Sequence, residues 1–192
     1  MRRGFKSLCE RIAESKRREL GLELTQPLDP HALAAHLDVM VWKPEDVPGL
    51  KADSLSQLVQ RDSDSWSAVT LRVEQAQLTI VNSAHSPTRQ TSSIAHELAH
   101  LLLEHEPDRI DLSEDGHLLL SSFERDQEDE ATWLAGALLV PREGLRRAFY
   151  RSKNEQLLAS QFGVSVQLLQ WRLRMTGVAL QARRARSFKA RA

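Results

Sequence analysis

The sequence predicts an α+β fold with a small antiparallel or mixed sheet, two apolar helices at its centre and a helical C-terminal part. Apolar residues recur at helical spacing near the N-terminus, and two later segments are apolar around most of a helix. Between them lie two short runs that alternate as strands do. A chain of 192 residues is long enough to bury a substantial core.

The composition is that of a soluble globular protein, with 41% hydrophobic and 27% charged residues. The formal net charge is zero, so no overall field favours nucleic acid or a membrane as a partner. Cys9 is the only cysteine, which excludes an internal disulfide and fits a reducing compartment. No apolar run is long enough for a signal peptide or a bilayer span, so we expect a cytoplasmic protein.

The N-terminal third should contain two helices and a strand. Apolar residues from Phe5 to Ile12 predict an amphipathic helix over residues 3–20, with Cys9 as a buried filler and Gly21 as its end. Asp29-Pro30 has the form of an N-cap followed by proline at the first helical position. Val39–Trp42 then resembles a strand.

The middle of the chain should hold a hairpin. Residues 43–64 are polar and interrupted by proline and glycine, so mostly irregular structure with one helical turn near Leu55 is expected. Ala68–Val73 and Gln77–Val81 alternate as the strands of an antiparallel hairpin. Residues 82–90 form a polar loop.

A strongly apolar helix follows, beginning near Thr91–Ser93, where several hydroxyl groups could cap it. Apolar residues from Ile94 to Leu103 occupy most of its surface, so this helix should be packed on two sides. It therefore places His96 and His100 inside the protein, where imidazoles need partners.

These histidines belong to the motif His96-Glu97-Leu98-Ala99-His100, which spells H-E-x-x-H. Histidines four apart lie one above the other on a helix, so both can bind one metal ion. Glu97 lies about 100° around the helix, near enough to take a proton from a water activated by the metal. The motif predicts zinc-assisted hydrolysis of peptide bonds, with Glu97 as the general base.

A catalytic zinc needs a third protein ligand. The acidic cluster Glu128-Asp129-Glu130 opens a second helix, expected over about residues 127–139. Helical periodicity favours Glu130, which lies beside the buried stripe; Glu128 is the alternative, and Asp129 points further round. The predicted metal ligands are thus His96, His100 and Glu130.

Other side chains compete for secondary roles. His105, five residues past His100 on the same helix, should face away from the histidine pair, whereas His117 lies in a loop and could reach it. Tyr150, His117 or an arginine could stabilise the oxyanion. His31, His36 and His85 are interpreted as surface or loop residues. The strand Gln77–Val81 could align a substrate peptide by adding it as an extra strand.

Several segments resemble the ImmA/IrrE-type metallopeptidases. They are Leu78–Asn82, Arg89-Gln90 with Ile94–Leu101, and Glu130–Pro141, which is similar to the family's E-A-N-x-F-A-x-x-L-L-M-P segment. Ala99 and Thr132 depart from the usual glycine and asparagine. The resemblance implies a zincin-like fold, a Zn²⁺ cofactor held by His96, His100 and Glu130, and Glu97 as the base.

The resemblance also implies a biological role. Proteins of this kind are typically cytoplasmic regulatory proteases that cleave a helix-turn-helix repressor and so switch on stress, mobile-element or phage-defence genes. Two other classes compete with this expectation: a DNA-binding regulator with a structural zinc site, and a protein that sequesters its partner without cutting it.

The C-terminal part resembles a helix-turn-helix, with Gly163 at the turn and Ser165 as an N-cap. It could bind DNA with the help of Arg172 and Arg174, or it could simply support the peptidase. We expect a metallopeptidase core over residues 1–145, a helical subdomain over 146–182, and a basic, mobile tail over 183–192 with a lesser prospect of contacting nucleic acid.

Overall fold

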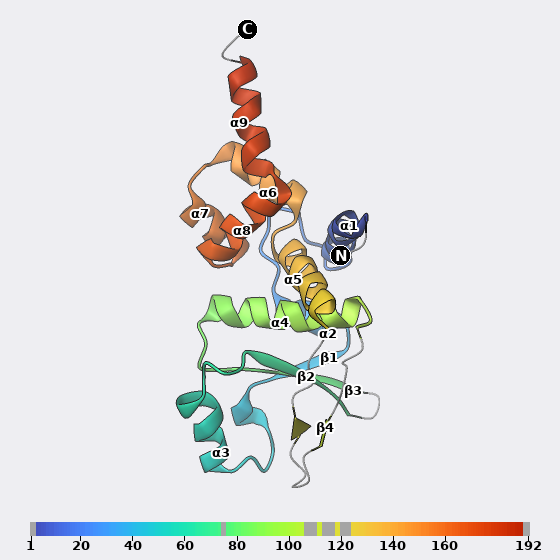
Figure 1. Cartoon of the computed structure of the whole chain (residues 1–192), viewed down its shortest axis with the longest axis vertical. Coiled ribbons are helices and arrows are strands. Elements are labelled where there is room, and N and C mark those ends of the chain that lie inside the picture. Colours follow the sequence, from blue (N-terminus) through green and yellow to red (C-terminus); the bar gives the residue numbers. More distant parts are fainter. Residues whose placement is uncertain (1–2, 74–75, 106–110, 113–117, 120–123, 190–192) are drawn as a thin grey trace.

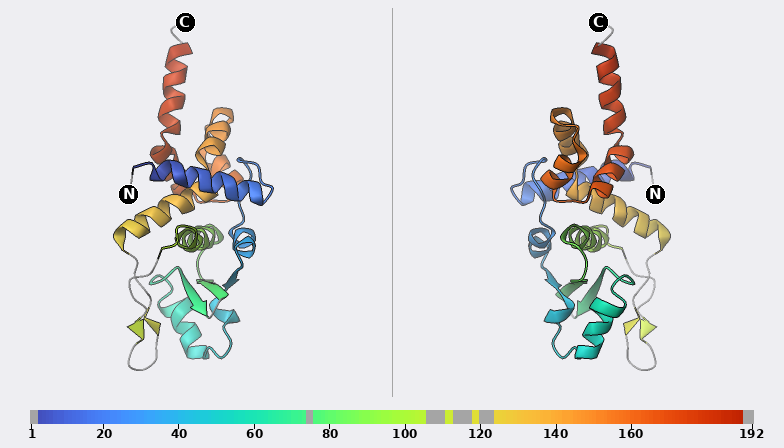
Figure 2. Two further views of the ribbon diagram at one scale, coloured as in Figure 1. Left: turned by 90° about the vertical axis from the view of Figure 1, so that its right-hand side faces the viewer. Right: turned by 90° about the vertical axis from the view of Figure 1, so that its left-hand side faces the viewer.

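The computed structural model describes residues 3–73, 76–105, 111–112, 118–119 and 124–189. These residues are arranged in layers, with a small sheet on one side and a bundle of helices on the other (Figure 1). The long helix α4 (Pro87–Leu102) runs between the two. Figure 2 shows α4 end-on, with the sheet below it and α1 and α5 above it.

The N-terminal elements agree with the predicted ones. Helix α1 spans Phe5–Glu19, helix α2 spans Pro30–His36 and strand β1 spans Val39–Trp42. The Asp29 side chain caps α2 by accepting a 2.9 Å hydrogen bond from the backbone N–H of His31. Cys9 is fully buried in the core, as expected.

The sheet is mixed and has the order β1-β3-β2 among the described strands. Strands β2 (Ala68–Val73) and β3 (Ala76–Val81) pair antiparallel, which confirms the hairpin, while β1 pairs parallel to β3. The preceding segment holds a short 3₁₀ helix at Pro44–Asp46, then α3 (Ala52–Ser56) and a π-helical turn at Gln57–Arg61.

Helix α4 begins four residues before the predicted start at Thr91. Its first residue is Pro87, whose fixed φ and missing N–H suit the first position of a helix, so the capping role expected of Thr91–Ser93 was wrong. Ile94, Leu98 and their neighbours on α4 are fully buried between the sheet and α5, as the apolar pattern predicts.

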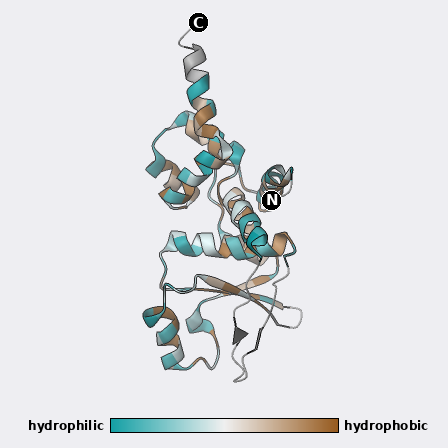
Figure 3. Ribbon diagram, viewed as in Figure 1, coloured by the Kyte–Doolittle hydropathy of each residue, from teal (hydrophilic) through white to brown (hydrophobic). Residues whose placement is uncertain are grey.

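Helix α5 (Arg125–Leu139) crosses α4 and also packs against α1. It changes from hydrophilic at its N-terminal turn, beside α4, to more hydrophobic residues further along (Figure 3). Between α4 and α5 lies a two-stranded antiparallel ladder of β4 (Asp111–Leu112) and β5 (Leu118–Leu119), which the sequence did not lead us to expect.

Two buried arginines bind the backbone where α5 ends. The Arg17 guanidinium donates to the carbonyl oxygens of Leu138 and Leu139 at 3.1 and 2.9 Å, and Arg172 Nε donates to that of Val140 at 2.9 Å. The last carbonyls of a helix lack partners within it, so these cations satisfy them and oppose the negative end of the helix dipole.

The C-terminal part consists of helices alone. They are α6 (Arg142–Arg151), α7 (Glu155–Phe162), α8 (Val166–Thr176) and α9 (Val178–Lys189). Gly163 ends α7 in the left-handed conformation, and the Ser165 side chain caps α8 by accepting from Leu168 N, as predicted. The backbone of residues 183–189 continues α9, which projects from the bundle (Figure 1).

No helix among the described residues combines the length and the apolar character needed to cross a bilayer. The proposed division at residues 145 and 182 stays a prediction.

Candidate metal centre

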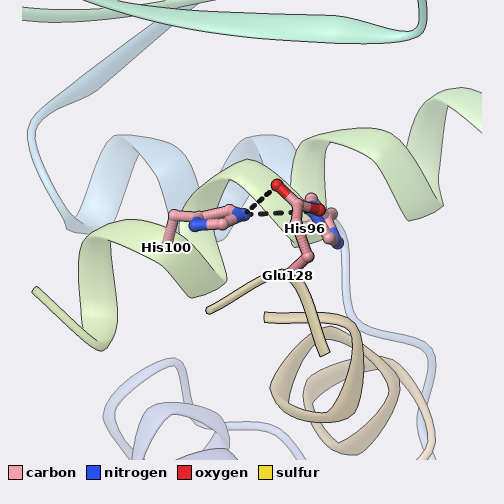
Figure 4. Close-up of side chains that lie close together, drawn as sticks. All are labelled: His96, His100 and Glu128. Carbon is pink, nitrogen blue, oxygen red and sulfur yellow. Dashed lines mark hydrogen bonds and ion pairs between the residues drawn. The ribbon is translucent and has the colours of Figure 1, made fainter. Parts of the chain in front are cut away.

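The H-E-x-x-H motif lies in the buried middle of α4. His96 and His100 project from one side of this helix toward the first turn of α5 (Figure 4). The ring centroids are 4.8 Å apart, and the two Nε2 atoms are 3.1 Å apart. The four-residue spacing has thus brought two imidazole nitrogens to one point, as a helix requires.

A carboxylate from the second helix closes the group. Glu128 Oε2 lies 3.1 Å from His96 Nε2, and Glu128 Oε1 lies 3.5 Å from His100 Nε2. One ligand atom from each of these residues falls within 4.8 Å of the others. We call His96, His100 and Glu128 the ligand triangle.

The ligand triangle fits a divalent metal ion. Two imidazole nitrogens and one carboxylate oxygen form a donor set that zinc uses at catalytic sites, where a fourth position stays available. The His100 imidazole is buried and lies near His96 and His105. Burial is the main cause that lowers the pKa of His100 to about 3, and the two neighbouring rings lower it further. His100 is therefore neutral near pH 7, the form that binds a metal.

The structure places Glu128 beside the two histidines, whereas the predicted third ligand was Glu130. Glu130 is buried, as predicted, but its Oε2 lies 3.5 Å from His105 Nε2, not in the triangle. Residues two apart on a helix point in nearly opposite directions, so Glu128 and Glu130 cannot serve the same point. Glu130 was favoured because it lies beside the buried stripe of the helix. The residue in the ligand triangle is instead Glu128, whose side chain is 45% exposed.

His105 also lies elsewhere than predicted, because α4 stops before reaching it. Glu104 adopts a left-handed φ of 55°, and the backbone N–H groups of Glu104 and His105 bond to the carbonyls of Leu101 and His100. This pair of bonds is a Schellman turn. It reverses the chain, so the His105 ring packs against the His100 ring instead of facing away from it.

Glu97 points to the sheet. Its Oε2 accepts a 2.8 Å hydrogen bond from the hydroxyl of Thr70 on β2, and that hydroxyl also contacts Thr79 Oγ1 on β3 at 3.0 Å. Burial raises the pKa of the Glu97 carboxyl above its ordinary value, partly offset by the Thr70 hydrogen bond and by His96. A base with a raised pKa is better matched to neutral pH.

Sequence reasoning missed Thr70. Threonine is common in strands, and only the packing of β2 under α4 gives this one its contact with Glu97.

The remaining candidates lie away from the ligand triangle or outside the described residues. His117 falls outside the described ranges. Tyr150 is exposed on α6, where Lys153 and Arg146 lie over its ring. His31 and His36 are exposed, as predicted, whereas His85 is buried in its loop and its Nε2 lies 2.9 Å from the Ser63 carbonyl.

An H-E-x-x-H helix that faces a carboxylate from a second helix thus forms a group of side chains that could hold a metal ion, with a glutamate beside it. The IrrE N-terminal-like domain family, Peptidase_M78, matches residues 55–174. The chain therefore belongs to this family, as the ImmA/IrrE resemblance predicted. The matched range runs from α3 to α8, so α1, α2 and β1 lie before it.

Among solved structures, the chain is similar to a transcriptional regulator of Mycobacterium tuberculosis, with 20% sequence identity and a TM-score of 0.54. The similarity covers 90% of this chain but 47% of that one, so the chain spans about half of the length of its structural neighbour. At this identity the likeness concerns the fold. None of the curated proteins matches the chain.

Proposed function

We propose that the protein is a zinc-dependent endopeptidase of the zincin type that cleaves a helix-turn-helix transcriptional repressor. The observation that carries this proposal is the ligand triangle, with Glu97 in the same helix between its two histidines. Membership in the Peptidase_M78 family supports a peptidase.

Each residue of the site would have a separate role in hydrolysis. His96, His100 and Glu128 would hold the zinc ion, which when bound supplies Lewis acidity. Glu97 would accept a proton from the attacking water and return it to the nitrogen of the leaving amine. Thr70 holds the Glu97 carboxylate on the sheet side of α4 while it does so.

The sheet offers one edge for a substrate peptide near Glu97. Strand β3 was expected to accept the peptide, but that expectation was wrong, because β1 and β2 already pair with its two sides. Among the described strands, β1 and β2 form the two edges of this sheet, and β2 carries Thr70 beside Glu97. An extended peptide added along β2 would pass near the catalytic carboxylate.

The repressor as substrate rests on the family resemblance and on the regulatory character of the structural neighbour, which is described as a transcriptional regulator. On this reading the protein acts in the cytoplasm and relieves repression of stress, mobile-element or phage-defence genes. The helix-turn-helix-like pair α7–α8 would support the peptidase.

The competing class is a DNA-binding or partner-sequestering regulator with a non-catalytic zinc site. Arg172, one of the two arginines expected to aid α8 in binding DNA, is fully buried and its Nη2 bonds to Glu10 at 2.6 Å. Arg172 cannot contact DNA in this arrangement. Of the two arginines on α8 that were expected to bind DNA, only Arg174 is exposed. Contact with nucleic acid through residues 183–192 stays a lesser proposal.

The test compares the full-length wild type with Glu97→Gln, both loaded with one equivalent of zinc. Each is incubated with a proteome-derived peptide library, and new termini are identified by mass spectrometry; intact helix-turn-helix repressors are then tested. We expect cleavage by the wild type and its loss in Glu97→Gln, with equal zinc content in both. No cleavage by the zinc-loaded wild type, or full cleavage by Glu97→Gln, would contradict the proposal.

A further inference from the structure

We propose that His105 and Glu130 are positioning residues that fix the orientation and the tautomer of His100 for metal binding. The inference rests on the proposed function in one respect, the binding of a metal ion by the ligand triangle. It assigns a role to two side chains that lie outside the ligand triangle and beside His100.

The three side chains form a continuous chain that ends at the ligand triangle. Glu130 Oε2 lies 3.5 Å from His105 Nε2, and His105 Nδ1 lies 3.1 Å from His100 Nδ1. The other ring nitrogen of His100, Nε2, faces His96 and Glu128. Each nitrogen of His100 therefore has a separate task, one toward His105 and one toward the metal position.

The chemistry of the groups allows one proton arrangement that leaves Nε2 ready for a metal. A carboxylate oxygen accepts hydrogen bonds, so Glu130 Oε2 favours a proton on His105 Nε2. With its proton on Nε2, the His105 ring presents Nδ1 as an acceptor, and His100 Nδ1–H donates to it. His100 Nε2 is left with its lone pair directed into the triangle.

The surroundings preserve this arrangement. The side chains of His100, His105 and Glu130 are 4%, 7% and 12% exposed, so water has little access to the contacts between them. The Schellman turn at Glu104 fixes His105 through the backbone, because the His105 N–H bonds to the His100 carbonyl at 3.0 Å. The same residue pair is thus joined through both backbone and side chain.

The geometry separates this role from direct ligation. The His105 nitrogen nearest to His100 faces Nδ1, on the side of the ring away from the triangle, and its other nitrogen faces Glu130. Outer partners of this kind hold a metal-binding histidine in one tautomer and one ring orientation, and their loss typically lowers metal affinity by roughly 10- to 100-fold.

The experiment measures zinc affinity of the full chain by competition with a chromophoric chelator at pH 7. His105→Leu should weaken zinc binding by about 10- to 100-fold. His105→Asn should restore part of the affinity, because its amide oxygen can accept from His100 Nδ1–H. Glu130→Gln should cause a smaller loss than His105→Leu. The matched control is His85→Leu, which removes another buried imidazole and should leave zinc affinity unchanged.

Two further measurements distinguish positioning from general damage. Thermal unfolding of the metal-free variants reports whether each one folds. In the Co(II)-loaded protein, the visible absorption spectrum of His105→Leu should keep the form that three protein ligands give, while the exchangeable Nδ1–H proton signal of His100 should be lost from the NMR spectrum of that variant.

The outcomes separate this inference from the proposed function. If the wild type binds no zinc, the metal centre itself is wrong. If the wild type binds zinc and folded His105→Leu binds it equally tightly, the positioning role is wrong. A much larger loss in Glu130→Gln than in His105→Leu, with a changed Co(II) spectrum, would make Glu130 a ligand and would also overturn the inference.

Discussion

The Thr70 hydroxyl donates a 2.8 Å hydrogen bond to the Glu97 carboxylate and thereby joins the edge strand β2 to the H-E-x-x-H helix. Thr79, opposite Thr70 in the β2–β3 ladder, contacts the same hydroxyl at 3.0 Å and is fully buried. The orientation of the proposed general base is consequently set by the sheet as well as by its own helix.

Replacement of this hydroxyl should slow the chemical step. Thr70→Val should lower kcat by roughly 10-fold, the size expected when a charged group loses one hydrogen bond, and should change KM little. Thr70→Ser, which retains the hydroxyl, should stay near wild type. Steady-state kinetics on a cleavable peptide provide the measurement; a loss confined to KM would argue against a role in orienting Glu97.

The two glutamates at the start of α5 should differ in their effect on metal binding. Glu128→Ala should weaken zinc binding by more than about 100-fold, beyond the usual effect of an outer partner. Asp129→Ala, which removes an exposed neighbouring carboxylate, should have no effect. Chelator competition measures both, and wild-type affinity in Glu128→Ala would show that Glu128 is not a ligand.

The metal-free protein should lose stability in mildly acidic solution because of His100. Its pKa is lowered from 6.5 to about 3 by burial, so between these values the unfolded chain binds a proton that the folded one does not. Stability therefore falls as pH drops from about 6.5 toward 3, by up to about 1.4 kcal/mol per pH unit for this one group. Urea unfolding with chelator at pH 5.0 to 6.5 tests the slope, which should be flatter in His100→Gln.

Gly144 should not tolerate a side chain. A Cβ atom at this position of α6 would lie 2.0 Å from the carbonyl oxygen of Leu24, which is backbone and cannot move aside cheaply. Gly144→Ala should destabilise the protein by about 1–3 kcal/mol, or more if the contact cannot relax. Arg151→Ala on the same helix, at an exposed site, should stay within about 0.5 kcal/mol of wild type in denaturant unfolding.

Arg172 should contribute strongly to stability. It is buried between Glu10 and the Val140 carbonyl, and Arg172→Met removes both contacts. The expected loss is about 3 kcal/mol, the lower end for a broken buried pair, because Glu10 still accepts from the Arg142 N–H. Arg174→Met, an exposed change on α8, serves as the control in chemical unfolding, and equal losses in the two variants would contradict the assignment.

Features that depend on a single helix or on neighbouring strands could be predicted from the sequence. The spacing of His96 and His100 and the caps at Asp29 and Ser165 follow from local geometry, so they could be read directly. The hairpin of β2 and β3 also followed from alternation of nearby residues. These features need no knowledge of how distant elements pack.

The side chains that lie elsewhere than expected depend on packing between elements or on an unusual backbone. Choosing Glu128 over Glu130 required the crossing of α5 over α4, which periodicity does not give. The position of His105 depends on the left-handed backbone conformation of Glu104, which residues other than glycine and asparagine rarely adopt. The burial of Arg172 required the docking of α8 on α1 and α5, although an arginine on a helix usually indicates a solvated face.

The two ends of α5 are held by different parts of the chain. Its 15 residues form a rod of about 22 Å, anchored at the C-terminal end by Arg17 and Arg172 and contributing Glu128 near the other. Pivoting such a rod by about 5° would displace its far end by about 2 Å, comparable to a metal–ligand bond. The orientation of α5 that the two arginines fix at its C-terminal end therefore determines whether Glu128 can reach the metal position near the other end.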